Sequence, residues 1–207
     1  MRFFDRRLVM TMALTVLLAA CGGGKAGGAV STEDMSMGKA DAKVTVVEYA
    51  SASCPHCARW NNDVFPAFKA KYVDTGKVRY VYREFLTPPV EMASAGFLLA
   101  RCAGKDKYFT VLDAIYRNQS EMYQSGDIRG GLLRIAQSMG LSEKQFNSCI
   151  SDDDSLKALN DRVEKYQREA KIQGTPTFFF NGDRYDKGEM SLAEMDAAYA
   201  KAAAAAK

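Results

Sequence analysis

The residues best suited to chemistry in this chain are two cysteines with two residues between them, Cys54-Pro55-His56-Cys57. Two thiols at this spacing can close a disulfide within one turn, so the pair can be oxidised and reduced. The β-prone stretch Val44–Ala50 precedes them, and apolar residues recur at every third or fourth position after them. The cysteines are therefore predicted to lie where a buried strand turns into a helix.

The start of a helix makes the two sulfurs unequal. Amide hydrogens in the first helical turn have no partner within the helix, and they stabilise an anion placed beside them. We therefore predict that Cys54 is the acidic, exposed sulfur and that Cys57 is more buried. A nucleophile would then reach Cys54 first.

Other uses of such a pair fit the sequence less well. A structural zinc site needs a second pair of ligands, but the remaining cysteines are isolated and His56 is the only histidine. Haem attachment needs a histidine in place of Ala58, and a purely structural disulfide seldom closes so short a loop. The pattern favours redox chemistry, with no metal and no cofactor other than the Cys54–Cys57 disulfide.

The N-terminal residues predict export. A basic start and an apolar run over residues 8–20 are too short for a membrane span and are typical of a signal peptide, predicted at 1–20. Leu18-Ala19-Ala20-Cys21 resembles the lipobox of bacterial lipoproteins, in which Cys21 would be lipidated; a plain cleavage site is the alternative. The glycine-rich residues that follow predict a flexible tether over 21–38.

The rest of the chain predicts one domain with a large insertion. The formal net charge of +3 is spread without a basic run, so no nucleic-acid partner is expected. Hydrophobic periodicity predicts strands at Val44–Ala50, 77–85, Thr177–Phe180 and 184–186. It predicts helices at 57–74, Val90–Cys102, 108–119, 132–139, Glu143–Ile150, 156–170 and from Ser191 onward.

This order of elements predicts the α/β class, with a thioredoxin-like fold and an inserted all-helical subdomain. The first two strands flank one helix, so a right-handed crossover should make them parallel. Pro66 is expected to kink that helix, and Asn181-Gly182 to join the last two strands. We assign 39–87 and 171–207 to the thioredoxin-like domain and 88–170 to the helical insertion.

These features resemble the DsbA family of periplasmic thiol-disulfide oxidoreductases over about residues 37–200. The resemblance rests on Glu48, the Cys-Pro-His-Cys motif, the helical insertion and Gly174-Thr175-Pro176-Thr177-Phe178. It implies an enzyme that donates a disulfide to folding secreted proteins with free thiols. It also implies reoxidation by a DsbB-type, quinone-linked membrane oxidase and, with a lipidated Cys21, a periplasmic location at a membrane.

The resemblance assigns roles to the residues of the motif. Cys54 matches the nucleophile and Cys57 its resolving partner, while His56 would stabilise the Cys54 thiolate through charge or a hydrogen bond. Glu48 matches a buried acid that moves protons to and from Cys57. Some family members pair this acid with a lysine, which is absent from residues 77–85 here. Arg79 and Arg83 lie nearby in the sequence, and which of them faces Glu48, if either does, is left open.

The resemblance also places a substrate site, and the cysteine count leaves one further pair of cysteines. Pro176 matches the family's cis-proline, which packs against the redox disulfide, and the backbone of Thr175 pairs with substrate; Pro55 is expected to contact substrate too. Cys102 and Cys149 end two predicted helices, and in an oxidising compartment we expect them to pair; two buried free thiols are the alternative.

Two other function classes remain. A disulfide isomerase or reductase of the same fold is one, but an isomerase's dimerisation region has no room between Cys21 and Val44, and reductases prefer Gly-Pro between the cysteines. A non-catalytic lipoprotein that holds unfolded chains is the other, and the intact Cys-Pro-His-Cys motif disfavours it.

Overall fold

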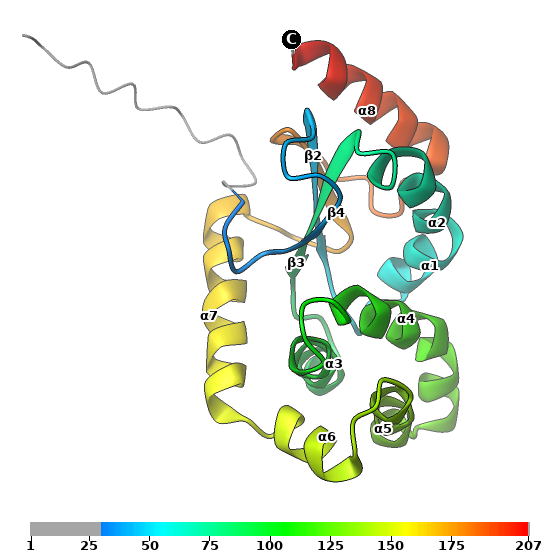
Figure 1. Ribbon diagram of the computed structural model, residues 1–207, viewed down its shortest axis with the longest axis vertical. Helices are drawn as coiled ribbons and strands as arrows, with labels where there is room; N and C mark the ends of the chain where they lie inside the picture. The colour runs from blue at the N-terminus through cyan, green and yellow to red at the C-terminus, as the bar shows by residue number, and fades with distance from the viewer. Residues whose placement is uncertain (1–29, 207) are drawn as a thin grey trace, which may run out of the picture.

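Figure 1 shows the computed structural model of the protein, which describes residues 30–206. A five-stranded sheet with the order β1-β3-β2-β4-β5 lies at its centre. The strands are β1 (Met35–Met37), β2 (Val44–Ala50), β3 (Val78–Glu84), β4 (Thr177–Phe180) and β5 (Asp183–Tyr185). As predicted, β2 and β3 are parallel, whereas the other neighbouring pairs are antiparallel.

Helices cover both faces of the sheet and form a separate group at one end of it (Figure 1). One face packs against α7, and the other against α1, α2 and α8, while α3 to α6 lie together beyond the end of β3. The helical segments are α1 (Pro55–Asp63), α2 (Phe65–Phe68), the π-helical segment η1 (Lys69–Val73), α3 (Val90–Cys102), α4 (Tyr108–Ser125), α5 (Ile128–Ser138), α6 (Glu143–Ile150), α7 (Asp153–Ala170) and α8 (Leu192–Ala205).

The first helix begins earlier than predicted and is interrupted near Pro66. It begins at Pro55, where a proline is tolerated because the first amide of a helix has no partner. As predicted, the helix is interrupted near Pro66: α1 ends at Asp63, and Pro66 lies in the first turn of α2, where its missing N–H is tolerated. The cysteine motif is thus the first turn of α1.

Several insertion helices are longer than the periodicity indicated, because polar caps lie outside the apolar pattern. Asp127 caps α5 by accepting a hydrogen bond from Gly130 N, and Asp152 caps α7 by accepting one from Ser155 N. The last helix has the predicted capping box, formed by Ser191 and Glu194.

Strand β1 lies within the segment that was expected to be a flexible tether up to residue 38. It pairs with β3, and next to it the carboxylate of Asp34 meets the buried guanidinium of Arg83, with Nε 3.0 Å from Oδ1. Tyr166 of α7 also donates to Asp34, at 2.8 Å. The sequence Met35-Ser36-Met37 has no clear strand pattern. The pairing with β3 and the contacts of Asp34 explain why this segment forms a strand.

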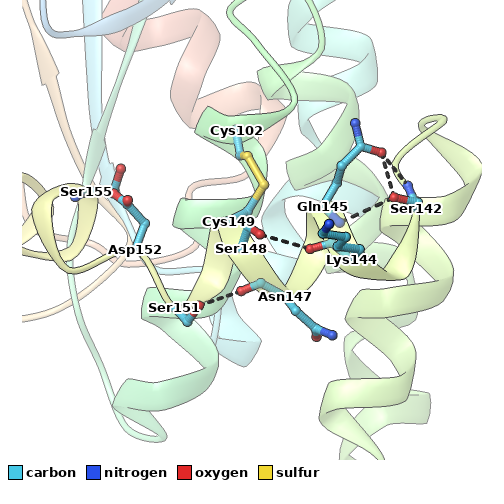
Figure 2. The surroundings of a disulfide bond; sticks show 10 residues. All are labelled: Cys102, Ser142, Lys144, Gln145, Asn147, Ser148, Cys149, Ser151, Asp152 and Ser155. Atoms are coloured by element: carbon cyan, nitrogen blue, oxygen red, sulfur yellow. Dashed lines mark hydrogen bonds between the residues drawn. A yellow bond between two sulfur atoms is a disulfide. The ribbon is translucent and has the colours of Figure 1, made fainter.

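Cys102 and Cys149 form a disulfide between the end of α3 and α6 (Figure 2), with their Cα atoms 5.9 Å apart. Figure 2 also shows the capping box at the start of α6, in which Ser142 and Gln145 exchange hydrogen bonds. Cys149 is buried and Cys102 is exposed. The bond fastens two helices of the insertion to each other.

Candidate active site

The turn that carries Cys54 is held by the helical insertion. Cys54 is the N-cap residue of α1, and its amide donates to Ser51 O at 3.0 Å. Three side chains of α4 donate to the carbonyl groups of the same turn: Tyr116 to Ser51 (3.2 Å), Gln119 to Ala52 (2.9 Å) and Tyr123 to Ser53 (2.5 Å). The insertion therefore fixes the backbone just before the reactive cysteine, a role that the sequence analysis did not foresee.

The two sulfurs are both reduced, and they differ in access in the predicted order. Cys57 is completely buried, whereas 6% of Cys54 is exposed. Cys54 is nevertheless less open than predicted, because the loop at Thr175 lies against it: Sγ is 3.3 Å from the Thr175 carbonyl oxygen. The approach to Cys54 is therefore narrow.

Hydrogen bonds lower the pKa of Cys54 from 9.0 to about 5. The largest contribution is the hydrogen bond from the Cys57 thiol, followed by the Thr175 side chain and the amides of Cys57 and His56, while burial opposes them. The Thr175 hydroxyl is buried without another partner among the described residues, so it is free to donate to a thiolate. Burial raises the pKa of Cys57 well above its usual value. The anion of the pair is therefore Cys54.

Glu48 is almost fully buried, with 2% of its surface exposed. Burial raises the pKa of its carboxyl to about 8, and a hydrogen bond from the Tyr80 hydroxyl works in the opposite direction. Arg83 turns to the other face of the sheet, where it meets Asp34. The hydrogen-bond partner of Glu48 is thus Tyr80, a neutral residue, and not Arg83.

The imidazole of His56 contacts residues other than Cys54. Its Nδ1 meets the carboxylate of Glu189, and the Arg59 guanidinium binds the same carboxylate, with Nη2 2.6 Å from Oε1. His56 supports the thiolate through its backbone amide. Glu189 lies in the loop between β5 and α8, and no sequence pattern marks it.

A groove of about 330 Å³ is lined by residues 173–177 together with Arg184, Asp186 and Gly188. One of its lining residues, Thr175, also lies against Cys54 through its carbonyl oxygen. The peptide bond between Thr175 and Pro176 is cis, and Pro55 is exposed at the start of α1. The structure thus brings Thr175 to the sulfur and places Thr175 and Pro176 in the wall of one groove.

Several predictions concern places apart from this site. Cys21, the signal peptide and the tether up to residue 29 lie outside the described residues. Within residues 30–206, no group of three or more His, Cys, Asp and Glu side chains is arranged to hold a metal ion. In the same residues, no helix is both long and apolar enough to cross a membrane.

The amino-acid sequence is similar to those of known proteins. A family model described as thioredoxin matches residues 30–199. A protein of Rickettsia bellii named "Putative protein-disulfide oxidoreductase" is 36% identical over 154 residues, which are 74% of this chain and 59% of that protein. This chain thus spans somewhat more than half the length of that relative.

Solved structures agree in fold. The crystal structure of alpha-DsbA1 from Wolbachia pipientis superposes with a TM-score of 0.75 and 26% identity, covering 86% of this chain and 94% of that one. BdbD from Bacillus subtilis, in its oxidised form, gives a TM-score of 0.71 at 22% identity, covering 87% and 99% of the two chains. The second of these likenesses concerns the fold alone.

Proposed function

The chain belongs to the thioredoxin family and is DsbA-like, and from this premise we propose that it is a protein-disulfide oxidoreductase that oxidises thiols through Cys54 and Cys57. The membership confirms the predicted family and the predicted fold class, a thioredoxin-like fold with a helical insertion. The observation that carries the proposal is the contrast between the two sulfurs. Cys54 is acidic and reachable, whereas Cys57 is fully buried beneath it.

This contrast favours an oxidase over a reductase. A thiolate with a low pKa is a good leaving group and stabilises the reduced protein, so its disulfide is readily passed on. A substrate thiolate attacks Cys54 Sγ, the Cys54–Cys57 bond breaks, and Cys57 leaves and takes up a proton. A second substrate thiolate then attacks the substrate sulfur of the mixed disulfide and releases Cys54 as a thiolate. The substrate gains one disulfide, and the enzyme ends reduced.

The substrates and the location follow from the same proposal. The groove along residues 173–177 suits an extended chain that pairs with the Thr175 backbone, and the Thr175 carbonyl lies 3.3 Å from Cys54 Sγ. We infer that the substrates are folding secreted proteins with free thiols. The N-terminal sequence supports export to the periplasm and anchoring through a lipidated Cys21. A DsbB-type, quinone-linked membrane oxidase would then restore the disulfide.

Oxidative refolding tests the activity. The oxidised full chain is mixed with a reduced, unfolded protein that needs several disulfides, and its insulin-reducing activity is measured in parallel. We expect the wild-type chain to oxidise the substrate faster than it reduces insulin. The Cys54→Ser variant should no longer oxidise the substrate. Faster insulin reduction would indicate a reductase, and unchanged refolding by Cys54→Ser would indicate a holdase.

Cell fractionation tests the location. The full chain should appear in the membrane fraction of a Gram-negative host, and Cys21→Ser should release it while leaving thiol oxidation unchanged. A chain that remains soluble with Cys21 intact would contradict the lipid anchor.

A further inference from the structure

The buried carboxyl of Glu48 has a neutral hydrogen-bond donor as its partner. Residues 46, 48 and 50 of β2 share one face of the sheet with Tyr80 and Tyr82 of β3, because Val46 pairs with Tyr80 and Glu48 with Tyr82. The Tyr80 hydroxyl donates to Oε2 of Glu48, and the two residues are only 3% and 2% exposed. Because water has little access to these two residues, it cannot readily replace their hydrogen bond. This hydrogen bond therefore determines how the Glu48 carboxyl is held.

The groups around Glu48 come from every element packed against it. Its titratable neighbours are Cys54 in the turn before α1, Cys57 in α1, Tyr80 and Tyr82 in β3, and Tyr116 in α4. On β4, the residue opposite Glu48 is the apolar Phe178. The hydroxyls of Tyr82 and Tyr116 form a hydrogen bond with each other, with the two oxygens 2.7 Å apart. Among the described residues, the side chain that donates a hydrogen bond to Glu48 is Tyr80.

We propose that Tyr80 is a positioning residue that fixes the Glu48 carboxyl and sets the pH range in which Glu48 exchanges a proton with Cys57. This inference deepens the proposed function and rests on it. A hydrogen bond from a phenol favours the carboxylate over the carboxylic acid. Burial favours the acid and raises the pKa of Glu48 to about 8, so without Tyr80 the carboxyl would remain protonated to a still higher pH.

The nature of the donor matters as well as its presence. A lysine at this position would bring a positive charge and hold Glu48 as an anion. A phenol brings no charge, so Glu48 can change its protonation state close to neutral pH. A buried acid that titrates in this range can both give a proton and take one back.

Each half of the reaction uses this exchange in one direction. When a substrate thiolate displaces Cys57 from the disulfide, protonated Glu48 gives its proton to the Cys57 thiolate, and Tyr80 stabilises the carboxylate that remains. When the membrane oxidase restores the disulfide, the Cys54 thiolate first forms a mixed disulfide with it. The Glu48 carboxylate then takes the proton from the Cys57 thiol, the Cys57 sulfur attacks Cys54 Sγ to form the Cys54–Cys57 bond, and the bond to the oxidase sulfur breaks. The oxidase sulfur leaves as a thiolate with the electron pair.

The test compares Tyr80→Phe with Tyr82→Phe. Both variants keep a buried aromatic ring on the same face of β3, but only the first removes the hydrogen bond to Glu48. The protonation of Glu48 is followed in the reduced full chain by carbon NMR of labelled glutamate carboxyls, with Glu48→Gln identifying the signal. Tyr80→Phe should raise the midpoint by about one pH unit or more, the shift that follows from losing a hydrogen bond to a charged group. Tyr82→Phe should leave it near the wild-type value.

A second readout follows the thiol. The pH dependence of Cys57 alkylation is measured in a Cys54→Ser background, where the reaction is read at the Cys57 peptide by mass spectrometry. Tyr80→Phe should displace this profile when Glu48 is present and leave it unchanged in the Glu48→Gln variant, since the two side chains act as a pair. This comparison also controls for any change in packing, because a packing effect would appear in both backgrounds.

The possible outcomes distinguish a failure of the Tyr80 inference from a failure of the proposed function. An unchanged Glu48 midpoint in Tyr80→Phe, or an equal shift in Tyr82→Phe, would overturn the role of Tyr80. Neither titration depends on a substrate. A wild-type protein that fails to oxidise thiols would refute the proposed function and leave the titration result standing.

Discussion

The low pKa of Cys54 predicts how the stability of the reduced protein depends on pH. Its pKa falls from 9.0 to about 5 on folding. Because the folded value lies below the unfolded one, the thiolate stabilises the fold fully above pH 9, and this contribution is lost as the pH falls through 5. The oxidised protein has no Cys54 thiolate, so its stability lacks this pH-dependent contribution.

The size of the effect follows from the shift. Four units correspond to about 5.4 kcal/mol above pH 9, of which about 2.7 kcal/mol, or two units, is present at pH 7. Cys54 retains an opening to solvent, which screens its interactions, so we reduce the value at pH 7 to about 2 kcal/mol. For a two-electron couple this makes the disulfide more oxidising by about 40 mV than one formed from unperturbed thiols.

Denaturant unfolding of the reduced and oxidised proteins at pH 7 and pH 4 measures this contribution. The free energy of unfolding of the reduced form, minus that of the oxidised form, should fall by about 2 kcal/mol between the two pH values. Glu48 titrates in both forms, so most of its own pH dependence cancels in the difference. A difference that stays constant, or that increases as the pH falls, would refute the assignment of the thiolate to Cys54.

Three further changes test the surroundings of the site. Thr175→Val removes a buried hydroxyl beside the sulfur and should raise the pKa of Cys54 by about one to two units in a thiolate absorbance titration; an unchanged midpoint would exclude the hydroxyl as a donor. Glu189→Gln should lower that pKa slightly at low salt and not at high salt, because it removes a negative charge at the exposed rim of the site; a rise would contradict this. Replacing Cys102 and Cys149 together by serine should cost about 4 kcal/mol in denaturant unfolding, as expected for a loop of 47 residues, and should leave the Cys54 titration in place. A stability equal to that of the wild type would show that the second disulfide does not constrain the unfolded chain.

Much of the fold could be predicted because its strands and most of its helices have strong periodic patterns. Val44–Ala50, Val90–Cys102 and Thr177–Phe180 have the predicted bounds. Errors arose where local chemistry overrides the pattern. The first helix starts at Pro55 because proline is favoured in a first turn, and β1 depends on the Asp34–Arg83 ion pair, which joins residues 49 positions apart.

The site was predictable to the extent that its residues lie in one short motif. Cys54 and Cys57 follow from spacing, and Glu48 follows from a charge within an apolar strand. The partners that tune them come from elsewhere in the chain. Glu189 is 133 residues from His56, and Tyr80 is one of two tyrosines in β3. A regular spacing on α4, at 116, 119 and 123, could have indicated that one face of that helix supports the turn.

The arrangement of charges explains why Cys54, and not Cys57, carries the negative charge of the thiol pair. Burial disfavours a negative charge on Cys57 and on Glu48, and it raises the pKa of both. Hydrogen-bond donors favour a negative charge on Cys54, and the strongest of them is the thiol of Cys57 itself. This donor exists only while Cys57 is protonated, so a proton delivered to Cys57 also stabilises the Cys54 thiolate. In the proposed mechanism, the proton that Glu48 gives to Cys57 therefore also assists the release of substrate from Cys54, and proton transfer is coupled to disulfide exchange.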